Sequence, residues 1–208
     1  MSVHKEFDDS YRVNKDDLIA GFDEAGRGPI CGPVVAAGVI LKPDFDADII
    51  NDSKKMTPKQ RDLAYDLIIK EALFYHISIV SSQTIDQINI LEASRLGMQQ
   101  ALDDMINHNI KPNYLLTDYM KLNNTYDIKL DALKKGDAKS LNIGAASILA
   151  KVTRDRIMEE LDKKYPQYEL KKHKGYPTKR HLELIQEYGI KEDIYRLTFG
   201  PVKKIIEK

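Results

Sequence analysis

The stretch Leu18–Pro29 has the sequence LIAGFDEAGRGP, in which an apolar run ends abruptly in two acids. Leu18–Phe22 is short and apolar, so it is predicted to form a buried strand that enters a loop at Asp23. A pair of acids directly after a buried run destabilises a fold by several kcal/mol if the acids are buried without partners. Asp23 and Glu24 are therefore the first candidates for a functional site.

Apolar periodicity outside this stretch predicts alternating strands and helices. Short apolar or alternating runs predict strands at Val34–Leu41, Leu73–Val80, Tyr114–Thr117 and Ile128–Leu133. Runs with helical spacing predict helices from Thr57-Pro58 to about Ala72, from about Ile90 to Ile106, from about Ala138 to Lys164 and from about Lys179 to Tyr188. This order predicts an α/β fold with a mixed sheet, in which hairpin-linked strands come first and helix crossovers later.

The length of 208 residues fits one domain, or one domain with a small appendage. No apolar run approaches the ~20 residues that span a bilayer, and residues 1–17 lack the apolar stretch of a secretory signal. The single cysteine, Cys31, excludes an internal disulfide and is predicted to be a small buried apolar residue. These features predict a soluble cytoplasmic protein.

Charge is distributed unevenly along the chain. The net charge is zero, with 32 basic and 32 acidic residues, which taken alone argues against a nucleic-acid partner. Residues 1–119 nevertheless hold 12 Lys/Arg and 19 Asp/Glu, a net −7, whereas residues 120–208 hold 20 and 13, a net +7. The C-terminal half is therefore a candidate phosphate-binding face, with scattered surface lysines as an equal alternative.

Asp23, Asp118 and Asp137 each lie where a predicted strand ends, and Glu24 follows Asp23. Strand ends on one edge of a sheet converge, and converging carboxylates repel one another unless a cation binds between them. Carboxylate ligands without a Cys or His cluster suit Mg²⁺ or Mn²⁺, and two such ions ~3.5–4 Å apart can support phosphodiester hydrolysis. Taken singly, Asp137 is more simply explained as a helix N-cap and Asp118 as a turn residue.

Gly26-Arg27-Gly28-Pro29 is not a dinucleotide-binding loop, because Gly32 comes one residue late and prolines interrupt the expected helix start. Two glycines that flank an arginine suit close approach of the backbone to a ligand, with Arg27 available for a phosphate. A plain turn is an equal alternative.

The segment KKHKGYPT, residues 171–178, places Tyr176 among lysines. An aromatic ring there can stack on a sugar or base while the lysines bind phosphates. A solvated basic loop is the alternative, and it is slightly favoured when the segment is considered alone. His173 and His181 lack partners at zinc-ligand spacing, so both are expected to be surface residues.

Together these segments resemble bacterial ribonuclease HII, the type 2 ribonuclease H. The resemblance extends from about Leu18 to Lys204 and rests on motifs in the family's order at Ala20–Pro29, Gly32–Ala36, Asp52–Lys55, Lys135–Asp137, Ala145–Asp155, His173–Thr178 and Phe199–Pro201. The sister family, ribonuclease HIII, is disfavoured because it usually has Gly-Thr-Gly at positions 26–28 and an additional N-terminal domain. Two departures are Tyr119, where the family usually has a small residue, and Gly144, where Ala is more usual.

The resemblance implies a ribonuclease H-like fold: a mixed five-stranded sheet flanked by helices, with a C-terminal helical extension. Residues 1–17 are then a leader, 18–165 the catalytic core, and 166–208 a substrate-binding extension that forms one compact unit with the core. It implies an endonuclease that hydrolyses the RNA strand of RNA–DNA hybrids and cuts 5′ to single ribonucleotides in duplex DNA, leaving 5′-phosphate and 3′-hydroxyl ends. A monomer without membrane association is expected.

The resemblance also implies roles for particular residues. Asp23, Glu24, Asp118 and Asp137 would hold two Mg²⁺ or Mn²⁺ ions and carry the catalysis. The backbone of Gly26, Arg27 and Gly28 would contact the ribose 2′-hydroxyl, the group that separates RNA from DNA. Tyr176 would pack at the ribonucleotide–deoxynucleotide junction, with Lys54 and Lys55 near phosphates. Two alternatives remain: a non-cutting nucleic-acid-binding module, and another nuclease of this fold such as a junction resolvase.

Overall fold

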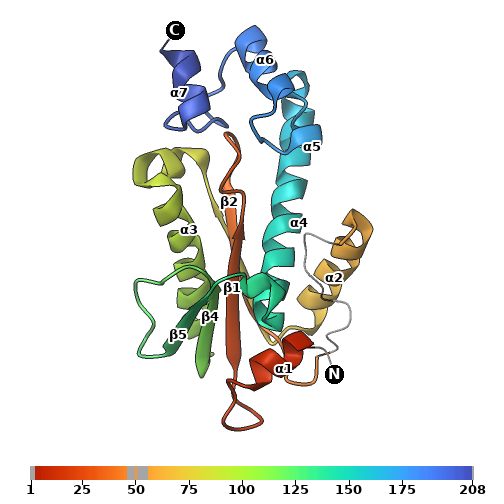
Figure 1. Ribbon diagram of the computed structural model, residues 1–208, viewed down its shortest axis with the longest axis vertical. Helices are drawn as coiled ribbons and strands as arrows, with labels where there is room; N and C mark the ends of the chain where they lie inside the picture. The colour runs from red at the N-terminus through yellow and green to blue at the C-terminus, as the bar shows by residue number, and fades with distance from the viewer. Residues whose placement is uncertain (1–2, 46–49, 51–55, 208) are drawn as a thin grey trace.

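The computed structural model describes residues 3–45, 50 and 56–207, and within them the chain forms one mixed sheet (Figure 1). Its five strands lie in the order β3-β2-β1-β4-β5. β1–β2 and β2–β3 pair antiparallel, whereas β1–β4 and β4–β5 pair parallel. The predicted α/β fold, with hairpin-linked strands first and helix crossovers later, is confirmed. The strands are β1 Ile19–Ala25, β2 Val34–Ile40, β3 Phe74–Val80, β4 Tyr114–Asp118 and β5 Lys129–Leu133.

Long helices cover both faces of this sheet. α2 (Pro58–Glu71) and α4 (Leu141–Lys164) lie on one face, and α3 (Ser82–Asn107) lies on the other (Figure 1). Alternate residues of β2 face the helices on opposite sides of the sheet: Ala37 packs with α2 and α4, and Ala36 packs with α3. The strand is buried along its whole length, which explains its continuous apolar composition. The shorter elements are α1 Val3–Asp9, α5 Leu170–His173, α6 Lys179–Tyr188, α7 Gly200–Ile206 and the 3₁₀ turns η2 Gly136–Ala138 and η3 Pro166–Tyr168.

Local sequence signals set the helix starts. Thr57 caps α2 as predicted, with its side chain accepting from the Gln60 N–H and Pro58 in the first turn. For α4, the cap is Ser140, whose hydroxyl accepts from the Ile143 N–H at 3.2 Å. Asp137 belongs instead to the separate turn η2, so the alternative role of Asp137 as the N-cap of the long helix is wrong.

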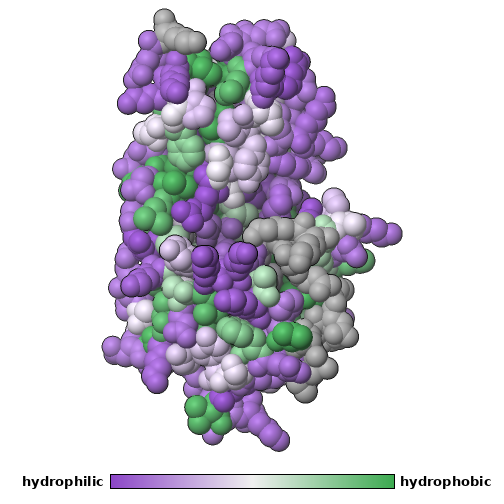
Figure 2. Space-filling view, in the orientation of Figure 1, coloured by the Kyte–Doolittle hydropathy of each residue, from purple (hydrophilic) through white to green (hydrophobic). Residues whose placement is uncertain are grey.

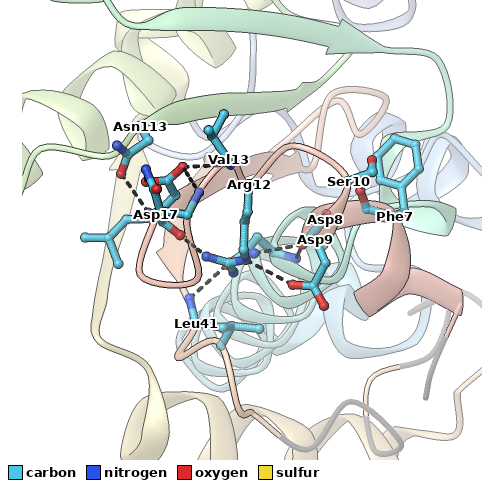
Figure 3. A network of polar contacts seen from close by, with 12 residues as sticks. Phe7, Asp8, Asp9, Ser10, Arg12, Val13, Asp17, Leu41 and Asn113 are labelled. Atoms are coloured by element: carbon cyan, nitrogen blue, oxygen red, sulfur yellow. Dashed lines mark hydrogen bonds and ion pairs between the residues drawn. The ribbon is translucent and has the colours of Figure 1, made fainter.

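The N-terminal segment packs on the start of α4. Asp8 is 2% exposed, and its Oδ2 accepts from the backbone N–H of Asn142 at 2.9 Å and from Asn142 Nδ2 at 2.7 Å. Asn142 Oδ1 accepts in turn from the Leu41 N–H at 2.8 Å. Figure 3 shows Arg12 between Asp9 and Asp17, donating to the Asp9 carboxylate and to the Asp17 carbonyl. Described residues of the expected leader are therefore tied to α4 by the buried Asp8–Asn142 bonds and to β5 by the Tyr11 hydroxyl, which donates to Asp131 Oδ2 at 3.0 Å.

The C-terminal segment shares an apolar cluster with the β1–β2 connection. Ile30 and Cys31 pack there with Met158 of α4 and with residues of the C-terminal elements. Cys31 is fully buried, as predicted. His181, which was expected at the surface, is also fully buried, so that prediction is wrong. It lies on the apolar face of α6, and its two ring nitrogens bond to the Tyr176 carbonyl and the Tyr195 hydroxyl, both at 2.9 Å.

The exposed surface fits this layered core. In the view of Figure 2, hydrophilic side chains dominate and hydrophobic patches are small and scattered. Within the described residues, none of the helices combines the length and the apolar character that crossing a bilayer would require.

Gly21 of β1 lies directly against α4, and this contact gives a test of the packing. A Cβ added at Gly21 would lie 2.2 Å from the backbone carbon of Asn142, whereas one added at Gly200 would meet nothing within 4 Å. We expect Gly21→Ala to lower the free energy of unfolding by about 3 kcal/mol, because backbone has to shift. Gly200→Ala is the control, with a change below about 1 kcal/mol. Urea unfolding of both variants measures the difference, and equal effects would refute this packing.

Candidate active site

The ends of β1 and β4 place the first three candidate acids. β1 continues to Ala25, three residues beyond the predicted end, so Asp23 and Glu24 lie within the strand, opposite Ala37 and Ala36 of β2. Parallel pairing sets Phe22 opposite Thr117 of β4. Asp23 and Asp118 each follow one member of that pair, so they occupy equivalent positions at one edge of the sheet.

A cleft of about 470 Å³ opens at this edge. Asp23, Glu24 and Asp118 line it together with Gly26 and Tyr176. It is also lined by residues not singled out from the sequence, namely Arg61 of α2 and Ser147, Lys151 and Arg154 of α4. The last three are spaced four and three residues apart and therefore share one face of a helix, a signal present in the segment Ala145–Asp155. Arg61 has no comparable signal in its local sequence.

Burial and mutual repulsion dominate the electrostatics of the cleft. Burial first, and then the neighbouring Glu24 carboxylate, raise the pKa of Asp23 well above its usual range, although a hydrogen bond from Ser147 opposes the shift. Burial raises the pKa of Glu24 to about 7; Asp118 adds to this rise, and Arg27, whose Nη1 lies 3.4 Å from Glu24 Oε1, opposes it. The cleft thus holds carboxylates that disfavour one another's charge.

Asp118 and Asp137 are linked through a turn. Asp118 Oδ1 accepts from the Gly136 N–H at 2.7 Å, which fixes the turn that contains Asp137. Asp137 is buried, at 5% exposure, but it is not among the residues that line the cleft. The structure therefore brings three of the four predicted acids into the cleft. Asp137 does not line the cleft, but it directly follows Gly136, whose N–H donates to Asp118.

Tyr119 departs from the family's pattern at a position with a special backbone. Its φ is +62°, in the left-handed region, and its side chain is 73% exposed. A small residue, glycine above all, adopts this conformation more easily, which gives a physical reason for the family's usual choice. The bulky side chain here extends into solvent, and the Asp118 carboxylate keeps its bond to Gly136.

The donor chemistry of the cleft fits a divalent cation. Carboxylate oxygens are the ligands that Mg²⁺ and Mn²⁺ prefer. Glu24 Oε1 pairs with Arg27, whereas Oε2 is buried and has no hydrogen-bond partner among the described residues, so this oxygen suits a metal ligand. Over residues 3–45, 50 and 56–207, no three His, Cys, Asp or Glu side chains stand close enough together to form a ready metal site. The chemistry of the acids fits the ion, and their spacing would have to tighten around it.

The segment Gly26–Pro33, called here the recognition loop, borders the cleft beside Tyr176. Gly26 has a φ of +98°, and a Cβ there would lie 2.1 Å from Arg154 Nε. A Cβ at Gly28 would lie 3.2 Å from Tyr176 Cε1, so the loop and this ring are in near contact. Close packing against Arg154 and Tyr176 thus accounts for both glycines, and the approach of this backbone to a ligand stays a prediction. Lys54 and Lys55 lie outside the described residues.

A mixed five-stranded sheet with an acidic cleft at its strand ends defines a nuclease of the ribonuclease H type. The chain belongs to the ribonuclease HII family, whose model matches residues 20–202. It is thus a metal-dependent endoribonuclease, of a family that cleaves the RNA of RNA–DNA hybrids.

Individual relatives agree with this membership. Ribonuclease HII of Mycoplasma mycoides subsp. mycoides SC is 47% identical over 206 residues, which cover 99% of this chain and 98% of that protein. The crystal structure of ribonuclease H2 from Pyrococcus horikoshii OT3 has a TM-score of 0.76 and 31% identity, covering 91% of this chain and 97% of that one. Bst-RNase HIII, solved in complex with Mn²⁺, shares the fold with a TM-score of 0.73 at 18% identity, covering 91% of this chain and 69% of that one.

Repulsion in the cleft makes a prediction about stability. We expect Asp23→Asn to raise Tm in EDTA by about 3 °C, because it removes one of the buried carboxylates that disfavour each other's charge. Added Mg²⁺ or Mn²⁺ should raise Tm of the original protein more than that of the variant. Thermal unfolding with and without metal measures both effects.

Asp62→Asn is the control, since Asp62 is an exposed acid paired with Arg156 on the surface. It should keep the original response to metal and change Tm little. An Asp23→Asn protein less stable than the original in EDTA would argue against the repulsion described.

Proposed function

We propose that this chain is a two-metal-ion endonuclease that cuts the RNA strand of RNA–DNA hybrids and also cuts 5′ to single ribonucleotides embedded in duplex DNA. Products would carry 5′-phosphate and 3′-hydroxyl ends. The observation that carries the proposal is the arrangement of one cleft, in which Asp23, Glu24 and Asp118 face the same space as Gly26 and Tyr176. Groups suited to bind cations and groups suited to contact a ribose thus border one another.

Asp23, Glu24, Asp118 and Asp137 would hold the ions, either Mg²⁺ or Mn²⁺. When bound, two such ions supply an activated water and stabilise the charge on the departing 3′-oxygen. Support comes from the mutual repulsion of the acids and from the partnerless Glu24 Oε2. Asp118 accepts a hydrogen bond from the Gly136 N–H, so the turn that carries Asp137 is tied to an acid that lines the cleft.

Cationic side chains on the rim would orient the strand that is cut. Lys151 and Arg61 line the cleft together with the acids, and Arg27 is half exposed and pairs with Glu24. Their charges suit the phosphates on either side of the scissile bond. Roles for Lys54 and Lys55 at neighbouring phosphates, a monomeric state and a cytoplasmic location stay predictions from the sequence.

Ribose selection is assigned to the backbone of Gly26, Arg27 and Gly28 together with Tyr176. The glycines let the backbone approach a sugar closely, and the Tyr176 ring lies against Gly28. A ring in that place can pack on the sugar that follows the ribonucleotide and favour the junction between the two nucleotide types.

The deciding experiment offers four substrates: an RNA–DNA hybrid, a duplex with one embedded ribonucleotide, an all-DNA duplex and a four-way DNA junction, each with Mg²⁺ and Mn²⁺ in turn. We expect cleavage of the first two only. Asp23→Asn should reduce the cleavage rate by at least about 100-fold while substrate binding persists. This loss is larger than the one expected when a residue only orients a metal ligand. Cutting of the junction would favour a resolvase, and binding without any cutting would favour a non-catalytic module.

Tyr176 provides a separate test of ribonucleotide selection. Tyr176→Ala should reduce kcat/KM at a single embedded ribonucleotide about tenfold, the size expected for loss of one stacking contact. The matched control is Tyr188→Ala, because both tyrosines are 48% exposed and Tyr188 does not line the cleft. Equal rates for the two variants would exclude the proposed role.

A further inference from the structure

Two arginines are buried beneath the recognition loop. Arg154 of α4 is 2% exposed, and Arg196, between α6 and α7, is fully buried. Neither guanidinium forms an ion pair with a carboxylate in the part of the chain that the structure describes. Burial of a charge without a counter-charge destabilises a fold unless hydrogen bonds replace those to the lost water. The hydrogen bonds that these two guanidinium groups form must therefore stabilise their burial.

The guanidinium of Arg196 forms five hydrogen bonds, all to backbone carbonyls of the recognition loop. Its Nη2 donates to the carbonyls of Gly26 at 2.7 Å and Pro33 at 3.0 Å. Its Nη1 donates to those of Arg27 at 3.2 Å and Pro29 at 2.8 Å, and Nε donates to Gly32 at 3.0 Å. The planar guanidinium has five N–H donors in a fixed fork, a geometry that a lysine ammonium does not reproduce.

Arg154 binds the same loop and joins it to the segment of Tyr176. Its Nε and Nη2 donate to the carbonyls of Pro33 at 3.0 Å and Cys31 at 3.2 Å, and Nη1 donates to Lys174 at 3.0 Å. The Ile30 N–H adds a bond to the Gly175 carbonyl at 2.9 Å. The loop and Tyr176 are therefore held as one unit.

The hydrogen bonds from Arg196 also fix the orientation of two peptide groups, Gly26–Arg27 and Arg27–Gly28. The described peptide bonds are all trans, and in a trans peptide the N–H points opposite to the C=O of the same unit. Because the Gly26 and Arg27 carbonyls point inward to Arg196, the N–H groups of Arg27 and Gly28 point away from it. A cation on the carbonyl side also polarises these peptides and strengthens their N–H groups as donors.

We propose that Arg196, with Arg154, is a positioning residue that holds the recognition loop so that the N–H groups of Arg27 and Gly28 face the ribose 2′-hydroxyl. This inference rests on the proposed function, in which that backbone selects the ribonucleotide. A lysine in place of Arg196 keeps the charge but cannot span five carbonyls, so the peptides regain freedom to rotate. Selectivity for ribose should then fall while general affinity for duplex nucleic acid remains.

The test measures two dissociation constants in the full-length chain carrying Asp23→Asn to prevent turnover. One is for a duplex with a single embedded ribonucleotide, the other for the all-DNA duplex of the same sequence. We expect Arg196→Lys to reduce the ratio of the two constants about tenfold and to change all-DNA affinity less than about twofold. Hydrogen–deuterium exchange of residues 26–33 should rise in the same variant.

The structural control is Val202→Ala, which truncates a buried residue of the apolar cluster that also contains Ile30 and Cys31 but removes no side-chain hydrogen bond to the loop. It should lower Tm but keep the binding ratio. If Arg196→Lys does not fold, Arg154→Lys carries the same test from the α4 side, with an expected fall of about threefold. A folded Arg196→Lys or Arg154→Lys variant with the original ratio overturns the proposal. Absence of any ribose preference before Arg196 is changed would instead count against the proposed function.

Discussion

Asp23, Glu24 and Asp118 lie together in one cleft, where burial and mutual repulsion disfavour their charge, and the packing around them must oppose that repulsion. β1 supplies two of the acids and is covered by α4 on one face and α3 on the other, so neither acid can retreat without disturbing the core. The Gly21–Asn142 contact shows how closely the helix approaches the strand. The acidic cleft is therefore held together by the closely packed apolar layers on both faces of the sheet, which tolerate little movement.

α4 connects the parts that meet at this cleft. At its start, Asn142 binds Asp8 of the N-terminal segment and Leu41 after β2. In its middle, Lys151 and Arg154 face the cleft and the recognition loop. Towards its end, Met158 packs in the C-terminal cluster. One rigid helix therefore sets the distances between the acids, the loop and the C-terminal elements.

Local sequence patterns predicted the succession of strands and helices along the chain and singled out the three acids that line the cleft, because apolar periodicity records which face of an element is buried. Element ends were less accurate: β1 runs on through Asp23 and Glu24, since pairing with β2 continues past the apolar run. Buried polar residues were missed for a different reason. Asp8 and Arg196 bind partners 134 and 170 positions away in the chain. His181 binds Tyr176 and Tyr195, 5 and 14 positions away, but no local pattern separates any of the three from surface residues. The motif resemblance, not periodicity, supplied the residues that are proposed to contact the ribose.

The contact between Arg196 and Gly26 spans 170 positions of the chain. Synthesis proceeds from the N-terminus, so the loop emerges well before Arg196 does. Strand pairing near the acids can form before Arg196 is synthesised, whereas the five hydrogen bonds from its guanidinium to the loop cannot. A polypeptide that terminates before residue 196 therefore carries Asp23, Glu24 and Asp118 without the hydrogen bonds from Arg196 that hold the neighbouring loop.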